Sequence, residues 1–250
     1  MDDTAEVPDE GDAYGKAIRD YYEDEEGFEI VERDDGFIAP SGGPEMYFSE
    51  YEEWGDHLHA GLDHLRGRVL DVGCGAGRHA LYAQGQGHDM VGIDVSAGAV
   101  EVSRERGVEN VRACDVADVG EAFDSDTFET VLMLGNNFGL VGTADTAPEV
   151  LDALATVTTE DARIIAESRD IYENIDEYHR SYHEYNRERG LLPGALRIRT
   201  RYKTHSTEWF DYLLVSPAEM DDVLAGTAWT RTETYRGEGG QYVAVLEKER

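Results

Sequence analysis

The sequence contains little lysine, few cysteines and no long apolar run. Lys occurs only at positions 16, 203 and 248, and the cysteines are Cys74 and Cys114. Two cysteines imply no disulfide framework, and each is more typical of a small packed residue than of a reactive thiol. No apolar stretch approaches the length of a membrane span, and the start MDDTAEVPDEGD lacks the basic residues of a secretory signal. We therefore expect a cytoplasmic protein without membrane contact.

Acidic residues dominate the charge. The 250 residues contain 54 Asp and Glu against 22 Lys and Arg, for a formal net charge of −32. A solvated acidic shell keeps a protein soluble where salt screens charge repulsion, so this composition favours a halophilic archaeal source. The alternative is an acidic surface that recruits a basic partner. The same charge repels nucleic acid in dilute buffer, which makes a nucleic-acid partner an unfavoured hypothesis.

The chain divides into three parts by composition. We expect a disordered acidic leader at residues 1–12, a helical cap or lid at 13–64, and the main domain at 65–250. From Arg68 short apolar strands alternate with helices, which predicts a doubly wound, mostly parallel α/β sheet. The expected strands cover 68–73, 89–95, 108–116, 128–135 and 162–168, and the expected helices cover 78–86, 97–107 and 147–157.

The alternation breaks after Ser168. An insertion at about 170–215 should contain a Tyr-rich helix at 171–190 and an added antiparallel hairpin made by 195–205 and 206–216. Ser216, Pro217 and Glu219 form the capping-box pattern that begins a helix. Residues 229–237 and 241–249 then predict a final hairpin.

A glycine motif follows the first expected strand. Residues 69–77 read VLDVGCGAG, which places Gly73, Gly75 and Gly77 between a strand and a helix. Glycines there let the backbone pass close beneath a nucleotide-like ligand and adopt unusual angles. A nicotinamide-binding loop would read Gly-x-Gly-x-x-Gly, whereas here Arg78 stands where that pattern needs its last glycine. Asp71 also precedes the first glycine by two residues, and both departures favour S-adenosylmethionine (SAM) over NAD.

Two further acids follow at βαβ spacing. Asp94 ends the second strand, where a carboxylate can accept hydrogen bonds from both ribose hydroxyls. Asp115 ends the third strand in position to accept from an adenine amino group, with Val116 beside the ring. The fourth strand ends in LMLGNNFG, from which a loop can contact both the methionine part and a substrate. Each acid alone could be a helix cap, but the ordered set predicts a SAM site.

Residues 68–168 resemble the core of the class I SAM-dependent methyltransferases, especially the small-molecule group with a first motif like VLDVGCGxG. The resemblance implies a seven-stranded Rossmann-like sheet whose last strand is antiparallel. It also implies cofactor-binding roles for Asp71, Gly73, Cys74, Gly75, Gly77, Asp94, Val95, Asp115, Val116, Leu134 and Gly135. SAM would be the cofactor and S-adenosyl-L-homocysteine the product, with no metal.

The substrate side carries weaker signals. Asn136 and Asn137 are candidates for contact with the methyl acceptor, or else a pair that stabilises a turn. Amine-methylating relatives have Asn/Asp-Pro-Pro-aromatic at this point. Here Phe138 keeps the aromatic residue but both prolines are missing, which argues against methylation of a nucleobase or amide. Tyr47 and Phe48 follow a Gly/Pro loop that could act as a lid, although cap aromatics could equally be packing residues.

Charged and titratable residues supply two more candidate groups. Arg197, Arg199, Arg201 and Lys203 alternate along one expected strand and so share a face. Arg199 and Arg201 are therefore candidates to bind an anionic substrate, or they pair with surface acids. His179 and His183 share a helix face and could form a solvated surface, act as a general base or bind a metal, although a third ligand is lacking.

Three functions fit these observations. The preferred one is a methyltransferase for a small molecule, active as a monomer or homodimer, with a catalytic residue that the sequence does not single out. The second is a protein or RNA methyltransferase. The third is a non-catalytic SAM-binding protein. The glycine loop and the downstream acids support cofactor binding in all three and cannot separate them.

Overall fold

The computed structural model describes residues 11–173 and 177–248. Within them a seven-stranded sheet has the order β11-β12-β7-β6-β3-β4-β5. Its strands are β3 (Val69–Val72), β4 (Met90–Asp94), β5 (Val111–Ala113), β6 (Phe128–Met133), β7 (Thr158–Arg169), β11 (Trp229–Arg236) and β12 (Gln241–Lys248). The pairs among β3 to β7 are parallel, and β12 is antiparallel to both β7 and β11. The predicted mostly parallel, Rossmann-like sheet is confirmed.

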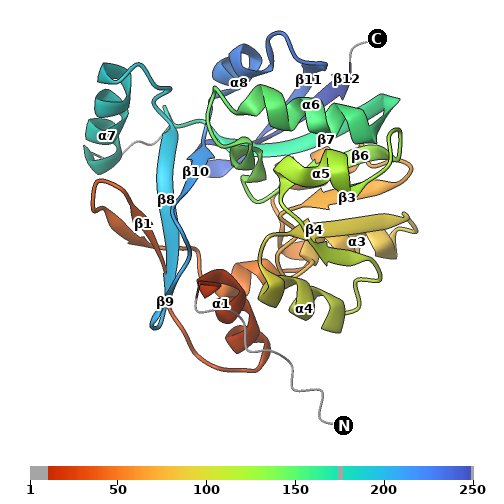
Figure 1. Cartoon of the computed structure of the whole chain (residues 1–250), viewed down its shortest axis with the longest axis horizontal. Coiled ribbons are helices and arrows are strands. Elements are labelled where there is room, and N and C mark those ends of the chain that lie inside the picture. The colour runs from red at the N-terminus through yellow and green to blue at the C-terminus, as the bar shows by residue number, and fades with distance from the viewer. Residues whose placement is uncertain (1–10, 174–176, 249–250) are drawn as a thin grey trace.

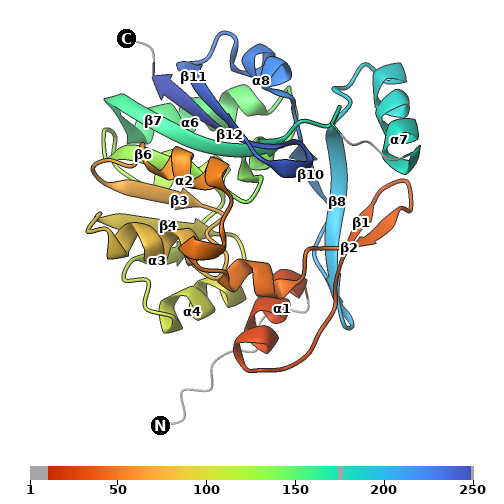
Figure 2. The ribbon, with the colours of Figure 1, turned by 180° about the vertical axis from the view of Figure 1, so that it is seen from behind.

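Helices cover both faces of this sheet. They are α2 (Asp56–Leu62), α3 (Arg78–Gly85), α4 (Ala97–Glu105), α5 (Val119–Ala122), α6 (Ala147–Val157) and α8 (Pro217–Leu224). Alternate strand residues enter two separate apolar clusters: Val131 and Met133 pack with α6 and α8, whereas Leu132 and Leu134 pack with α2 and α3. Figure 1 shows α6 and α8 on one face, and Figure 2 shows α2 on the other. Burial on both faces explains why these strands are nearly continuous apolar runs.

A second, antiparallel sheet stands beside the first. It has the order β10-β8-β1-β2, with β9 also paired to β8. Its strands are β1 (Glu29–Arg33), β2 (Ile38–Pro40), β8 (Ala195–Tyr202), β9 (His205–Ser206) and β10 (Phe210–Leu213). The insertion hairpin was predicted, and β8 and β10 do pair antiparallel. Figures 1 and 2 both show this sheet at the side of the main sheet.

The expectation that residues 13–64 form a helical cap needs correction. The segment contains α1 (Ala13–Tyr22), the short 3-10 helices η1 (Pro44–Phe48) and η2 (Tyr51–Glu53), and α2, but β1 and β2 lie between them. Strand β1 pairs with β8, which lies more than 160 residues further along the chain. The partner that makes β1 a strand is therefore invisible in the local pattern.

Helix α1 begins at a cap within the segment expected to be a disordered leader. Asp12 accepts a hydrogen bond from the Gly15 N–H at 2.8 Å, and its other oxygen accepts from the Ser96 hydroxyl and the Gly98 N–H. It therefore belongs to the fold, whereas residues 1–10 of the expected leader lie outside the described residues. These bonds anchor α1 to the start of α4, and the bond from the Tyr202 hydroxyl to Asp20 joins α1 to β8 of the second sheet.

Two other helices follow the sequence closely. The Tyr-rich segment, expected to be helical over 171–190, forms α7 over Glu177–Glu188, whereas 171–173 form a turn and 174–176 lie outside the described residues. Ser216 and Glu219 make the predicted capping box at the start of α8, with Pro217 in the first helical position. The remaining 3-10 helices are η3 (Val116–Asp118), η4 (Asn137–Val141) and η5 (Glu238–Gly240).

Candidate active site

The glycine loop leaves β3 in a conformation that requires glycine. Gly73, Gly75 and Gly77 have φ values of 68°, 54° and 81°, all in the left-handed region. The N–H groups of Gly73 and Cys74 donate to the Ile93 carbonyl at 2.8 and 3.0 Å, which ties the loop to the end of β4. A Cβ at Gly73 would lie 2.5 Å from the Asn137 side chain, so bare backbone is needed on steric grounds as well.

Asp94 holds the loop from the neighbouring strand. One carboxylate oxygen accepts from the Gly75 N–H at 2.8 Å, and the other accepts from the Ser96 N–H at 2.9 Å. The side chain is buried, and burial raises the pKa of Asp94 to about 6 despite these bonds. Each oxygen keeps a lone pair, so the carboxylate is fixed in place and can still accept from hydroxyl groups.

Two buried acceptor oxygens near the loop have no hydrogen-bond partner. They are Oδ2 of Asp71 and Oδ1 of Asn136. Burial, reinforced by the charge of Asp94 and opposed by Arg78, raises the pKa of Asp71 to about 7. Asn136 has φ 64°, a left-handed conformation that begins η4. A buried polar atom without a partner is costly, so both acceptors fit a site that receives a donor from a ligand.

Arg78 and Glu167 are two further charged side chains at the same edge. The Arg78 guanidinium donates to the Met46 carbonyl at 2.7 Å and to the Ser49 hydroxyl at 3.0 Å. Glu167, at the end of β7, accepts from the Gly135 N–H at 2.6 Å and lies 3.8 Å from the His57 ring. Arg78 thereby connects the amino-terminal segment to the glycine loop, and Glu167 fixes the loop after β6.

Tyrosines from three elements form the opposite side of this region. A Cβ at Gly75 would lie 2.7 Å from the Tyr14 hydroxyl, so α1 covers the glycine loop closely. Tyr14 meets Tyr47 edge to face at 5.0 Å between ring centroids. The Tyr212 hydroxyl donates to the Asn136 carbonyl at 2.6 Å. Tyr47, a predicted substrate candidate, thus lies against the tyrosine that covers the glycine loop, and Tyr212 was not predicted as a site residue.

Several predicted cofactor residues gather at this edge. The side chains of Cys74, Val116 and Leu134 are buried, whereas Val95 is 71% exposed at the end of β4. Asp115 is exposed and caps η3 by accepting from the Ala117 N–H at 2.9 Å. The cap role does not exclude ligand contact, because the carboxylate has further lone pairs. Burial raises the pKa of Cys74 well above normal, which describes a neutral packed thiol.

Three predicted substrate residues are engaged elsewhere. The Asn137 amide donates to the carbonyls of Val72 and Gly73, both at 2.9 Å, so it clamps the end of β3. Phe138 is fully buried in the main apolar cluster. Phe48 packs against α1 and under Arg106. These contacts correspond to the turn and packing alternatives rather than to substrate contacts.

The arginine row lies on the far side of the second sheet. Tyr212 is opposite Leu196 in the β8–β10 register, so these two side chains share a face of the second sheet. Because side chains alternate along a strand, the arginines at 197, 199 and 201 point to the other face. Arg199 and Arg201 both pair with Glu32, at 2.9 and 3.2 Å. Of the two interpretations of this row, pairing with acids agrees with the structure, since Arg199 and Arg201 pair with Glu32.

The two candidate histidines lie on α7, beyond β8 from the main sheet (Figures 1 and 2). His179 contacts Arg33 at 3.1 Å and the Phe37 ring, and burial lowers the pKa of His183 to about 4. They do not join the glycine loop. Across residues 11–173 and 177–248, no group of three potential metal ligands is present.

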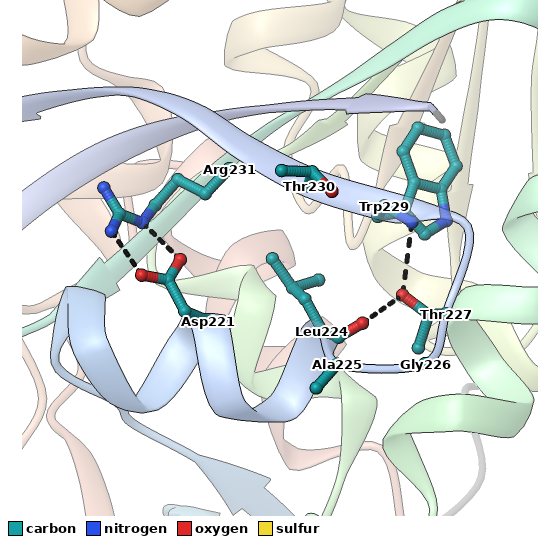
Figure 3. Close-up of a pocket in the computed structure, with 8 residues that line it drawn as sticks. All are labelled: Asp221, Leu224, Ala225, Gly226, Thr227, Trp229, Thr230 and Arg231. Atoms are coloured by element: carbon teal, nitrogen blue, oxygen red, sulfur yellow. Dashed lines mark hydrogen bonds and ion pairs between the residues drawn. The ribbon is translucent and has the colours of Figure 1, made fainter. Parts of the chain in front are cut away.

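A surface hollow between α8 and β11 is a separate feature (Figure 3). Asp221 and Arg231 form an ion pair at 2.6 Å at one end of it, and the Thr227 hydroxyl bonds to the Leu224 carbonyl at the other. β11 is the edge strand furthest from β3 and β4 on that side of the sheet. The hollow therefore lies apart from the glycine loop.

Comparison with known proteins shows similarity to methyltransferases. Residues 69–161 match the family described as a methyltransferase domain. A SAM-dependent methyltransferase from Bacteroides fragilis, solved with S-adenosyl-L-homocysteine, is 27% identical over 98% of each chain, with a TM-score of 0.81. A Methanosarcina mazei protein with 13% identity and a TM-score of 0.58, covering 78% of this chain and 98% of its own, shares the fold. The described residues contain no helix that could cross a membrane.

Curated relatives match over shorter stretches. The 2-heptyl-1-hydroxyquinolin-4(1H)-one methyltransferase of Mycobacteroides abscessus is 42% identical over 59 residues, which is 22% of this chain and 26% of that protein. An uncharacterised methyltransferase of Bacillus subtilis is 33% identical over 91 residues, 35% of this chain and 36% of its own length. The chain therefore spans about a quarter to a third of these relatives. Residues 69–161 thus match a methyltransferase domain, and the whole chain is similar in fold to a SAM-dependent methyltransferase.

Proposed function

We propose that this protein is a SAM-dependent methyltransferase that acts on a small molecule. The observation that carries the proposal is the glycine loop bound to the Asp94 carboxylate, with the unpartnered acceptors of Asp71 and Asn136 beside it. The full-length likeness to a methyltransferase solved with S-adenosyl-L-homocysteine supports the same cofactor.

The residues at this edge fit SAM by their chemistry. Asp94 would accept from the ribose hydroxyls, and Asp115 with Val116 would hold the adenine. Asp71 and Asn136 would accept hydrogen bonds from the amino group of the methionine part of SAM. That group would supply the donor that their buried oxygens lack. Arg78 is a cation suited to the carboxylate of SAM. Gly73, Gly75 and Gly77 have no side chains and so leave room for SAM above the backbone.

When bound, SAM supplies an activated methyl group. The protein then has to align an acceptor and keep water out, and alignment can provide much of the rate. Tyr14 and Tyr47 cover the loop, and Tyr212 fixes the backbone after β6. We assign these three side chains to shielding and positioning.

Three observations support a small acceptor. The relative from Mycobacteroides abscessus is named for a small-molecule substrate. The net charge of −32 disfavours RNA, and the arginine row is occupied by Glu32.

Calorimetric titration of the full chain with SAM tests the proposal, with NAD as the control ligand. We expect binding of SAM and S-adenosyl-L-homocysteine but not of NAD. Absence of SAM binding at every salt concentration between 0.1 and 3 M KCl, or preferential binding of NAD, would overturn the assignment.

We also propose that the acidic surface is an adaptation to high salt. Many cations of the described residues pair with carboxylates. The 22 Lys and Arg are nevertheless too few to pair with all 54 acids, so a net charge of −32 remains. Added salt should screen the remaining repulsion and raise the melting temperature. Thermal melts from 0.1 to 3 M KCl measure this, and full stability without salt would contradict it.

A further inference from the structure

Glu29 is a buried carboxylate that the structure leaves without a counter-charge. It begins β1 and is 3% exposed. Oε1 accepts from the Tyr47 hydroxyl at 3.1 Å, whereas Oε2 has no hydrogen-bond partner. Among the residues that the structure describes, no Lys, Arg or His forms an ion pair with it. A carboxylate held in this way is costly unless it is protonated or pairs with a ligand.

The surroundings of Glu29 connect it to the glycine loop. Tyr47 reaches Tyr14 edge to face, and the Tyr14 hydroxyl lies over Gly75. Burial and the charge of Glu29 raise the pKa of Tyr47, and Glu29 also contributes to the raised pKa of Tyr14. The titratable groups that face Glu29 from α1 and η1 are thus two neutral tyrosines. On the same face of the sheet, its partner in β8 is Tyr202, whose hydroxyl donates to Asp20.

Burial raises the pKa of Glu29, while the Ser41 and Tyr47 hydroxyls act in the opposite direction. The carboxylate is therefore a stronger base than a solvated one. Tyrosine rings around a carboxylate also suit a small cation, because ring faces attract positive charge. The missing partner is best supplied by a protonated amine, which offers both an N–H donor and the opposite charge.

Resting on the proposed function, we infer that Glu29 binds the amino group of the methyl acceptor and acts as the base that deprotonates it. The acceptor is accordingly a small amine. In the reaction the N–H bond breaks and its proton moves to Oε2 of Glu29. The nitrogen electron pair forms the new bond to the methyl carbon, and the electrons of the broken carbon–sulfur bond stay on sulfur. Tyr47 positions the carboxylate through Oε1.

Glu32 provides a matched control. It is three residues further along β1, on the opposite face, where it pairs with Arg199 and Arg201. The binding experiment compares wild type, Glu29→Gln and Glu32→Gln. Each protein is titrated with a panel of small aromatic and aliphatic primary amines. For each amine, the alcohol with the same carbon skeleton is the control ligand. Every titration is made with and without S-adenosyl-L-homocysteine.

We expect at least one amine to bind wild type about tenfold or more tightly than its alcohol. Glu29→Gln should remove that preference, and Glu32→Gln should keep it. With an amine that is turned over, Glu29→Gln should lower kcat about 100-fold or more and abolish the acidic limb of the pH profile. If no amine is preferred, or if Glu29→Gln retains the preference, the inference is wrong.

Stability gives a readout independent of any ligand. A raised pKa means that the folded state favours the protonated acid, so the contribution of Glu29 to stability is lost as pH rises. Glu29→Gln should therefore raise Tm by roughly 2–4 °C at pH 8, with the difference shrinking toward pH 4. A lower Tm at pH 8 would indicate a structural carboxylate and overturn the inference. Failure of S-adenosyl-L-homocysteine to bind wild type would instead refute the proposed function.

Discussion

The main sheet and the second sheet differ in what they present to the space between them. In β3 and β4 every residue is buried, and β3 ends in a loop with three left-handed glycines. In β8 the arginines alternate with residues of the other face, and they pair with acids from β10 and β1. The main sheet thus offers backbone groups and fixed carboxylates, whereas the second sheet and α1 offer side chains.

This contrast separates two kinds of recognition. A cofactor held by backbone geometry leaves a motif, because few sequences permit three left-handed residues in five positions. An acceptor held by side chains from three distant segments leaves no motif. Variants in each region should therefore affect different measurements.

The largest effect is expected from Phe138→Ala. Phe138 is fully buried among the core side chains of the main sheet, so truncation should cost about 3–5 kcal/mol of unfolding free energy. Urea denaturation measures this, and Phe48→Ala is the control at the periphery. Unchanged stability together with reduced methyl transfer would make Phe138 a substrate contact after all.

Asp94→Ala should affect the cofactor next most strongly. The Asp94 carboxylate holds the Gly75 N–H, and we propose that it accepts from the ribose, so its loss should weaken SAM binding by about 2–4 kcal/mol. Because the pKa of Asp94 is about 6, wild-type affinity should also fall below pH 6 as the carboxylate becomes protonated. Calorimetry from pH 5 to 8 tests both, and Asp118→Ala is an exposed control. Unchanged affinity in Asp94→Ala would remove this residue from the site.

Asp71→Asn should increase stability rather than decrease it. The folded-state pKa of about 7 lies above the ordinary value of 3.8, so the stabilising contribution is present below 3.8 and lost as pH rises toward 7. The variant should gain roughly 1–3 kcal/mol at pH 8, and the gain should vanish near pH 4. Denaturation at both pH values measures it. A variant less stable than wild type at pH 8 would show that the charged form is well solvated or paired.

The smallest effect is expected from Arg199→Gln combined with Arg201→Gln. Both arginines pair with Glu32 on the outer face, so SAM affinity should not change and Tm should stay within about 2 °C of wild type. Thermal melts and calorimetry are sufficient measurements. A tenfold loss of acceptor binding would instead support the anionic-substrate hypothesis for this row.

The sequence by itself determined the main sheet, the glycine loop and the fixed carboxylate at the end of β4. These depend on local signals: apolar runs at βαβ spacing, glycines where φ must be positive, and a capping box at Ser216. It also named Tyr47 as a site residue, from its place after a Gly/Pro loop.

Only the tertiary structure decided which side chains face that loop. Glu29 is one of 54 acids and became distinct only when β1 paired with β8 and turned it inward beside Tyr47. The same register turned Arg199 and Arg201 outward. Strand pairing between segments more than 160 residues apart sets these faces, and a shift of one residue would reverse them, so no local pattern could have specified them.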